Sequence, residues 1–148
     1  MQFTTPDGHH RQSHILIVND TQELLDIMKE LLEGEGYRVT TSVALLNLDK
    51  VKTLAPDVIV QDLLFAGTQE LGWKFLHLSQ LDPEVARIPF ILCTAAVGTV
   101  RDPAMAAQLE RLGIRVVLKP FDLEQLLQAL AEVLSASPAT PAIAPQGD

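Results

Sequence analysis

The chain has 148 residues, which fits one domain of the common size of roughly 100 to 150 residues and leaves no room for a second catalytic unit. Apolar residues make up 47% and aromatic residues only 5%, so the core must be built from Leu, Val, Ile and Ala. The 19 acidic and 11 basic residues give a net charge of -8, which argues against direct binding to nucleic acid or to an anionic membrane.

From the N-terminal side, short apolar or β-branched runs alternate with stretches whose apolar residues recur at helical spacing. The first kind predicts strands at 15–18, 37–41, 58–60, 88–93 and 114–118. The second kind predicts helices at 22–33, 44–54 and 73–81, then one after Asp102-Pro103 and a last one from Asp122.

Several residues predict where these helices begin and end. Gly34 and Gly36 are expected to stop the first helix. Asp102 before a proline, and Asp122 three residues ahead of Gln125, are typical of helix starts. The later two helices therefore have the best-defined beginnings.

Strands that are apolar throughout and separated by helices are typical of a parallel sheet covered on both faces. Five such units predict a doubly wound α/β fold, flavodoxin-like, with five helices and strand order 2-1-3-4-5. We expect this domain to occupy 14–134. A polar, disordered segment would precede it at 1–13, and a tail or linker rich in Ala, Pro and Ser would follow at 135–148.

Polar side chains stand at the carboxyl ends of the predicted strands, where doubly wound sheets form their ligand crevice. Strand one ends in Asn19-Asp20, strand three in Asp62, strand four in Thr94 and strand five in Lys119. Carboxylate and amide oxygens suit Mg²⁺, while a hydroxyl and an ammonium can contact phosphoryl oxygens. A single strand-end acid is most often a turn or capping residue. The whole set indicates phosphoryl chemistry, with one carboxylate as nucleophile.

Four motifs in this order carry a family resemblance: ILIVND at 15–20, PDVIVQDL at 56–63, ILCTA at 91–95 and LKPF at 118–121. With them the chain resembles the receiver domains of response regulators, the CheY-like family of two-component signalling, from about residue 14 to residue 134. The resemblance implies that Asp62 accepts a phosphoryl group, which Thr94 and Lys119 would contact.

The resemblance also implies a Mg²⁺ site. Its ligands would be Asp20, Asp62 and the main-chain carbonyl of Leu64, and Asn19 would hold a metal-bound water. The family usually has an acid where Asn19 stands, so we expect weaker Mg²⁺ binding here.

The family's partners follow from the same resemblance. A sensor histidine kinase or a phosphotransfer protein of a phosphorelay would donate the phosphoryl group, and a downstream protein of unknown identity would bind the switched surface. That surface would lie on the fourth and fifth βα units, through which a homodimer could also form. Self-catalysed phosphorylation and dephosphorylation would be the only chemistry, so the protein is not otherwise expected to be an enzyme.

Two further departures concern the switch and the loop after Asp62. Val116 stands where the family usually has Tyr or Phe, so the usual rotation of an aromatic side chain cannot operate. Ala66 stands where proline is common, and 68–70 lengthens the loop after Asp62. Asn19 and Val116 together leave open an alternative function: a degenerate receiver that binds a protein partner independently of phosphorylation. A phosphatase with an aspartyl nucleophile is disfavoured, because Leu64 stands where such enzymes need a second acid.

Cellular location is indicated only indirectly. Cys93 is the only cysteine and lies in an apolar run, so it is expected to be a packed thiol in a reducing environment. No stretch resembles a signal peptide or reaches membrane-spanning length. We therefore expect a cytoplasmic protein without membrane contact.

Overall fold

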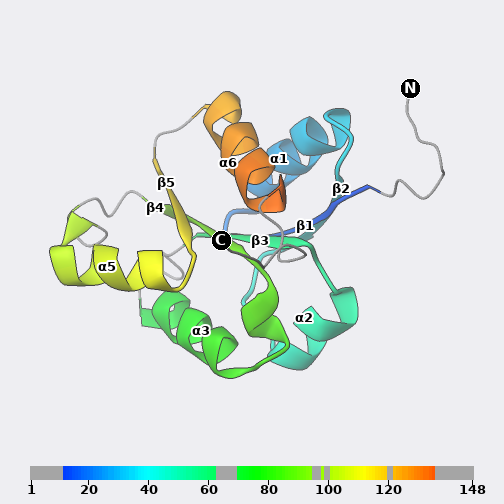
Figure 1. The fold of residues 1–148 in the computed structure, drawn as a ribbon. Helices are drawn as coiled ribbons and strands as arrows, with labels where there is room; N and C mark the ends of the chain where they lie inside the picture. The colour runs from blue at the N-terminus through cyan, green and yellow to red at the C-terminus, as the bar shows by residue number, and fades with distance from the viewer. Residues whose placement is uncertain (1–11, 63–69, 95–97, 99–100, 120–121, 136–148) are drawn as a thin grey trace.

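Strands and helices alternate along the chain, as Figure 1 shows for a computed structural model that describes residues 12–62, 70–94, 98, 101–119 and 122–135. The elements in chain order are β1 (His14–Val18), α1 (Gln22–Gly34), β2 (Arg38–Ser42), α2 (Leu48–Leu54), β3 (Val58–Asp62), α3 (Glu70–Leu81), the 3-10 helix η2 (Val85–Arg87), β4 (Phe90–Thr94), α5 (Pro103–Arg111), β5 (Arg115–Leu118) and α6 (Leu123–Ser135).

The five strands form one parallel sheet with the order β2-β1-β3-β4-β5. This confirms the predicted doubly wound fold and strand order. All residues of β1, β3 and β4 are buried. Helices cover both faces of these inner strands, which explains why their sequences are nearly continuous apolar runs rather than alternating ones.

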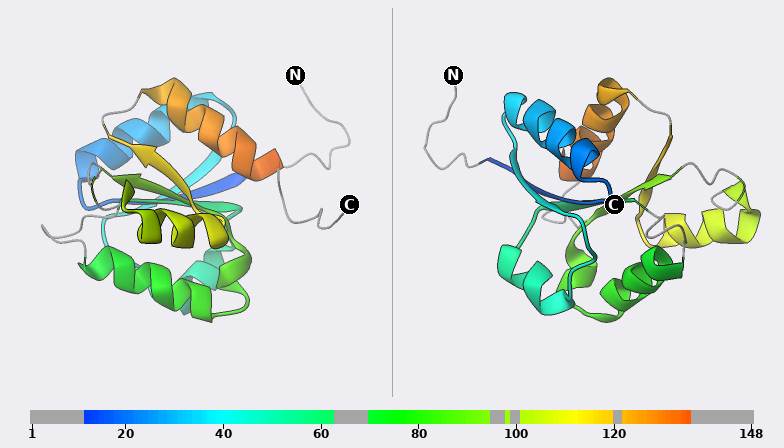
Figure 2. Two further views of the ribbon diagram at one scale, coloured as in Figure 1. Left: turned by 60° about the vertical axis from the view of Figure 1, so that its left-hand side comes forward. Right: turned by 180° about the vertical axis from the view of Figure 1, so that it is seen from behind.

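Two helical layers sandwich the sheet, α1 and α6 on one face and α2, α3 and α5 on the other (Figures 1 and 2). Alternate residues of each strand point into different layers. In β1, Ile15 and Ile17 pack in the core under α1 and α6, whereas Leu16 and Val18 pack in the core under α2, α3 and α5. The sheet therefore separates two apolar cores.

The predicted strand positions agree with the structure to within one or two residues. The strand predicted at 88–93 begins only at Phe90, because the turn of η2 ends on Ile88, its C-cap residue. The helix predicted at 73–81 begins earlier, at Glu70. Its start was hidden by Gly72, because a glycine disfavours a helix interior.

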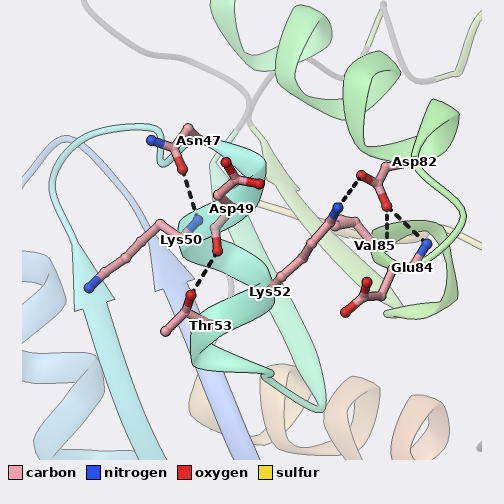
Figure 3. Close-up of polar contacts among 8 residues, drawn as sticks. All are labelled: Asn47, Asp49, Lys50, Lys52, Thr53, Asp82, Glu84 and Val85. Carbon is pink, nitrogen blue, oxygen red and sulfur yellow. Dashed lines mark hydrogen bonds and ion pairs between the residues drawn. The ribbon is translucent and has the colours of Figure 1, made fainter.

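The second helix is shorter than the predicted 44–54, and α2 begins only at Leu48. Asn47 is the reason: its Oδ1 accepts a hydrogen bond of 2.8 Å from the Lys50 N–H (Figure 3), so its side chain caps the helix at that point.

The first helix ends at Gly34, one residue beyond the predicted end at residue 33, which agrees with the prediction that Gly34 and Gly36 stop it. Glu35 is the C-cap, and its N–H donates to the Leu32 carbonyl over 3.0 Å. Gly36 then adopts a φ of 97°, a conformation that only glycine takes without strain, and it turns the chain into β2.

Both predicted helix starts near the C-terminal side are confirmed. Asp102 caps α5 by accepting from the Met105 N–H over 3.3 Å, with Pro103 as the first helical residue. Asp122 and Gln125 form a reciprocal capping box, with two hydrogen bonds of 2.9 Å between the side chain of one and the N–H of the other.

An ion pair joins α2 to the segment that follows α3 (Figure 3). Lys52 Nζ lies 2.7 Å from Asp82 Oδ2, and the other carboxylate oxygen, Oδ1, accepts from the Glu84 and Val85 N–H groups. The hydrogen bond from Lys52 lowers the pKa of Asp82, and the same contact raises the pKa of Lys52. A cavity of about 170 Å³ lies beside this pair and contains none of the predicted site residues.

The part of the chain that the structure describes includes no helix long and apolar enough to cross a membrane. The predicted first domain residue, His14, is the first residue of β1. Almost all of the two predicted terminal segments, 1–11 and 136–148, lies outside the described residues.

Candidate functional site

The carboxyl edge of the sheet brings together four of the predicted site residues. Asp62 and Thr94 are the last residues of β3 and β4, while Asn19 directly follows β1 and Lys119 directly follows β5. Parallel strands in register place these ends along one edge, with Asp62 opposite Cys93 and Thr94 opposite Leu118.

Asp62 is at the centre of this group. Lys119 Nζ donates to its Oδ2 over 2.7 Å, and Asn19 Nδ2 donates to the same oxygen over 3.2 Å. Asp62 is 8% exposed, so water screens its charge poorly and the two donors supply much of its stabilisation. Donors that are already oriented toward a buried carboxylate can stabilise negative charge that is added or redistributed there.

Main-chain hydrogen bonds position the two donors. The N–H of Lys119 donates to the Thr94 carbonyl over 2.9 Å, which ties the end of β5 to the end of β4. The N–H of Asn19 donates to the Ser42 carbonyl over 3.1 Å, and its Oδ1 accepts from the Thr21 N–H over 2.9 Å. The amide of Asn19 is therefore oriented with its NH₂ group toward Asp62.

The structure describes three of the four residues of the predicted metal site, Asn19, Asp20 and Asp62. Asp20 is exposed and follows Asn19 at the same edge, while Leu64 lies outside the described residues. Oxygen donors of this kind fit Mg²⁺. Among the residues that the structure describes, no group of three or more His, Cys, Asp or Glu side chains could hold a metal ion.

The space under the site is small. A hollow of about 10 Å³ is lined by Asn19, Asp62, Lys119, Cys93 and Met28 among others, and this is about the volume needed for one water molecule. Burial raises the pKa of the Cys93 thiol to about 12, and the smaller effects of Lys119 and Asp62 oppose each other. The predicted packed thiol is confirmed, and this hollow is too small to hold an organic substrate.

Val116 packs in the core under α2, α3 and α5, opposite Leu92 of β4 in register. It is a half-buried aliphatic residue there.

One residue of this region has a contact that the sequence did not suggest. Gln61 is fully buried, and its Nε2 donates to the Gly72 carbonyl in α3 over 3.2 Å. The only sequence signal was a polar residue at the end of an apolar strand, directly before the candidate nucleophile. That signal does not say which helix the amide contacts.

Comparisons with known proteins agree with this architecture. A family model described as the response regulator receiver domain matches residues 15–131. The transcriptional regulatory protein GlrR of Escherichia coli (strain K12) is 30% identical over 138 residues, which cover 88% of this chain and 28% of GlrR. Hybrid signal transduction histidine kinase D of Dictyostelium discoideum is 24% identical over 134 residues, which cover 90% of this chain and 8% of the kinase.

Solved structures give the same result. The non-phosphorylated HemR receiver domain of Leptospira biflexa matches with a TM-score of 0.67 at 26% identity, covering 89% of this chain and all of that domain. The fold and the family match together define a response regulator receiver domain, and the chain belongs to that family. It is homologous to receivers that accept phosphoryl groups in two-component systems. The chain spans only 28% and 8% of the two relatives' lengths.

Proposed function

We propose that Asp62 accepts a phosphoryl group from a phosphohistidine of a sensor histidine kinase or a phosphotransfer protein. The contact that carries the proposal is the ion pair between Lys119 Nζ and Asp62 Oδ2, at 2.7 Å, on a nearly buried acid at the end of β3. The lysine is a compact charge that can pair with the carboxylate before transfer and with a phosphoryl oxygen after it.

The transfer would be a displacement at phosphorus. A carboxylate oxygen of Asp62 forms the new O–P bond while the N–P bond of the phosphohistidine breaks, and the leaving imidazole keeps the electron pair of that bond. Lys119 and the Thr94 hydroxyl would offset the charge on the transferred group, since phosphoryl transfer is governed by positioning and neutralisation. Water would later hydrolyse the acyl phosphate.

Mg²⁺ would be held by Asp20, Asp62 and the Leu64 carbonyl, with Asn19 contacting a metal-bound water. When bound, the ion neutralises charge on the phosphoryl oxygens. Asn19 adds no charge to this set, and its NH₂ group already faces Asp62. These residues would therefore suit Mg²⁺, but with one carboxylate fewer than the family pattern.

We place the receiver at 14–134, in the cytoplasm, where two-component partners would meet it. Its phosphorylated form would bind a downstream protein, or a second copy, through the fourth and fifth βα units. Sedimentation of the chain with and without acetyl phosphate and Mg²⁺ tests the second-copy proposal.

Labelling with acetyl phosphate in the presence of Mg²⁺ tests the central proposal. We expect the intact mass to increase by one phosphoryl group, the product to be an acyl phosphate cleaved by hydroxylamine, and Asp62→Asn to abolish the increase. Asp57→Asn is the matched control, because Asp57 directly precedes β3 at the end opposite to Asp62, where its Oδ2 accepts from the His14 N–H over 2.7 Å. That variant should label like the wild type.

Two outcomes would contradict the proposal. Labelling that persists in Asp62→Asn would place the phosphoryl group elsewhere. A complete absence of labelling, with acetyl phosphate and with a phosphorylated histidine donor, would favour a protein-binding module that works without phosphorylation.

A further inference from the structure

Gln61 and Asp62 are chain neighbours that point into opposite helical layers. Asp62 lines the hollow with Met28 and Leu24, on the face covered by α1 and α6. Gln61 reaches the other layer, where its Nε2 donates to the Gly72 carbonyl in the first turn of α3 over 3.2 Å. The end of β3 thus connects the candidate nucleophile on one face with α3 on the other.

The Gln61 amide is only half satisfied. Its Oε1 is buried and has no hydrogen-bond partner among the residues that the structure describes. An orphaned buried oxygen destabilises a fold, whereas an apolar side chain of similar shape would not. Losing the amide would also leave no new orphan, because Gly72 lies inside α3, where its carbonyl can accept a helical N–H. Stability alone therefore does not explain a glutamine at this position.

We propose that Gln61 is a positioning residue that couples the phosphorylation state of Asp62 to the first turn of α3. The inference rests on the proposed function of Asp62. Phosphorylation adds about -1.5 to -2 charges at the end of β3, where Lys119 and Asn19 already donate hydrogen bonds to Asp62. The strand end must adjust to that charge, and the Gln61 side chain carries the adjustment to α3. Val116 cannot perform the relay that an aromatic side chain would give.

Trp73 makes this coupling measurable. It is the only tryptophan of the chain, it follows Gly72 directly, and it is partly buried against the core under α2, α3 and α5. Its ring is stacked on His77, with ring centroids 6.4 Å apart and planes inclined by 24°. A movement of the first turn of α3 would change these surroundings and therefore the indole emission.

The experiment follows Trp73 emission and the intact mass of the same sample while acetyl phosphate and Mg²⁺ are added at constant pH. The full chain is compared with Gln61→Leu, which keeps the bulk and removes the amide, and with Gln61→Asn, whose amide is too short to reach Gly72. Ser79→Ala is the matched control: Ser79 is also fully buried, but its hydroxyl donates within α3, to the Phe75 carbonyl.

We expect the wild type and Ser79→Ala to change their emission as they become phosphorylated. Gln61→Leu and Gln61→Asn should reach the same phosphorylated fraction but lose most of the emission change. A full emission change in phosphorylated Gln61 variants would overturn the coupling, and so would a phosphorylated wild type with unchanged emission. A wild type that cannot be phosphorylated at all would overturn the proposed function as well, so the two failures are distinguishable by mass.

Discussion

Lys119 and Asp62 form an ion pair across the sheet edge, with Lys119 Nζ 2.7 Å from Asp62 Oδ2 and side chains that are 27% and 9% exposed. The two residues belong to the ends of β5 and β3, which are not neighbours, because β4 lies between them. The lysine must therefore reach over the end of β4 to the acid. The hydrogen bond from the Lys119 N–H to the Thr94 carbonyl holds the main chain of Lys119 beside the end of β4.

The first prediction concerns the loss of this cation. Lys119→Met keeps the length of the side chain but removes its charge, and we expect the initial rate of labelling by acetyl phosphate to fall about 100-fold, the size of effect seen when one charge-stabilising donor is removed. Lys50→Met is the control, because Lys50 belongs to α2, whereas the donors to Asp62 come from the ends of β1 and β5. Equal labelling rates in both variants would show that Lys119 does not act in the transfer.

The second prediction concerns the amide of Asn19. Asn19→Asp replaces the donor that contacts Asp62 Oδ2 at 3.2 Å with a second carboxylate, so without Mg²⁺ the free energy of unfolding should fall by about 1–3 kcal/mol. Affinity for Mg²⁺ should rise about tenfold, or about 1.4 kcal/mol, because a charged oxygen is added to the site.

Titration calorimetry and denaturant unfolding with and without Mg²⁺ measure both effects. Asn47→Asp provides the same chemical change at the N-cap of α2, where Asp serves as well as Asn. An unchanged Mg²⁺ affinity in Asn19→Asp would exclude Asn19 as the residue that weakens the metal site.

The third prediction uses the ion pair of Lys52 and Asp82. The pKa of Asp82 is lowered from its ordinary value of 3.8 by the hydrogen bond from Lys52. A lowered acid pKa stabilises the fold above the ordinary value, and this contribution disappears as the pH falls through the lowered one. Lys52→Ala should therefore be less stable than the wild type at neutral pH, and the difference should vanish in acid.

Unfolding by denaturant across that pH range is the measurement. The pKa of Lys52 is raised from 10.5 by the same contact, so the difference should also persist until the pH rises past that raised value. Lys50→Ala is the control, and its difference from the wild type should not follow the titration of Asp82. If the difference in the free energy of unfolding between Lys52→Ala and the wild type stays constant in acid, the charge of the pair contributes nothing to stability.

The fourth prediction concerns the only thiol. Burial raises the pKa of Cys93 to about 12, and the thiolate is the form that reacts with thiol reagents. Near neutral pH the folded protein should react far more slowly than the chain in denaturant, where the ordinary pKa of 9.0 applies. Rapid, complete modification of the folded protein would contradict the packing of Cys93 in the core.

Local signals made much of the fold predictable. The apolar strands and the caps at Asp102 and Asp122 act through neighbouring residues, so their effects are visible in sequence. The predicted start of the second helix is wrong for a related reason. An apolar pattern extends back to Ala44, but the side chain of Asn47 accepts a hydrogen bond from the Lys50 N–H and caps the helix there. A competing local hydrogen bond outweighed the hydrophobic pattern.

Tertiary contacts were less accessible from the sequence. Strand order predicted that Asn19, Asp62 and Lys119 would converge, and they do. The direction of the Asn19 amide could not be predicted, because it depends on the Thr21 N–H that holds its oxygen. The half-satisfied state of Gln61 depends on where α3 packs, and no pattern in β3 specifies that contact.

The strand order also has a consequence for how the chain folds. β2, β1 and β3 are adjacent in the sheet and consecutive in the first part of the chain, so they can pair before β4 and β5 are available. Asp62 completes that early unit, but Lys119 comes 57 residues later, and chains are synthesised from the N-terminus. The acid would then be placed before its counter-ion arrives. If the pair forms after the transition state, Lys119→Met should accelerate unfolding and leave the refolding rate nearly unchanged.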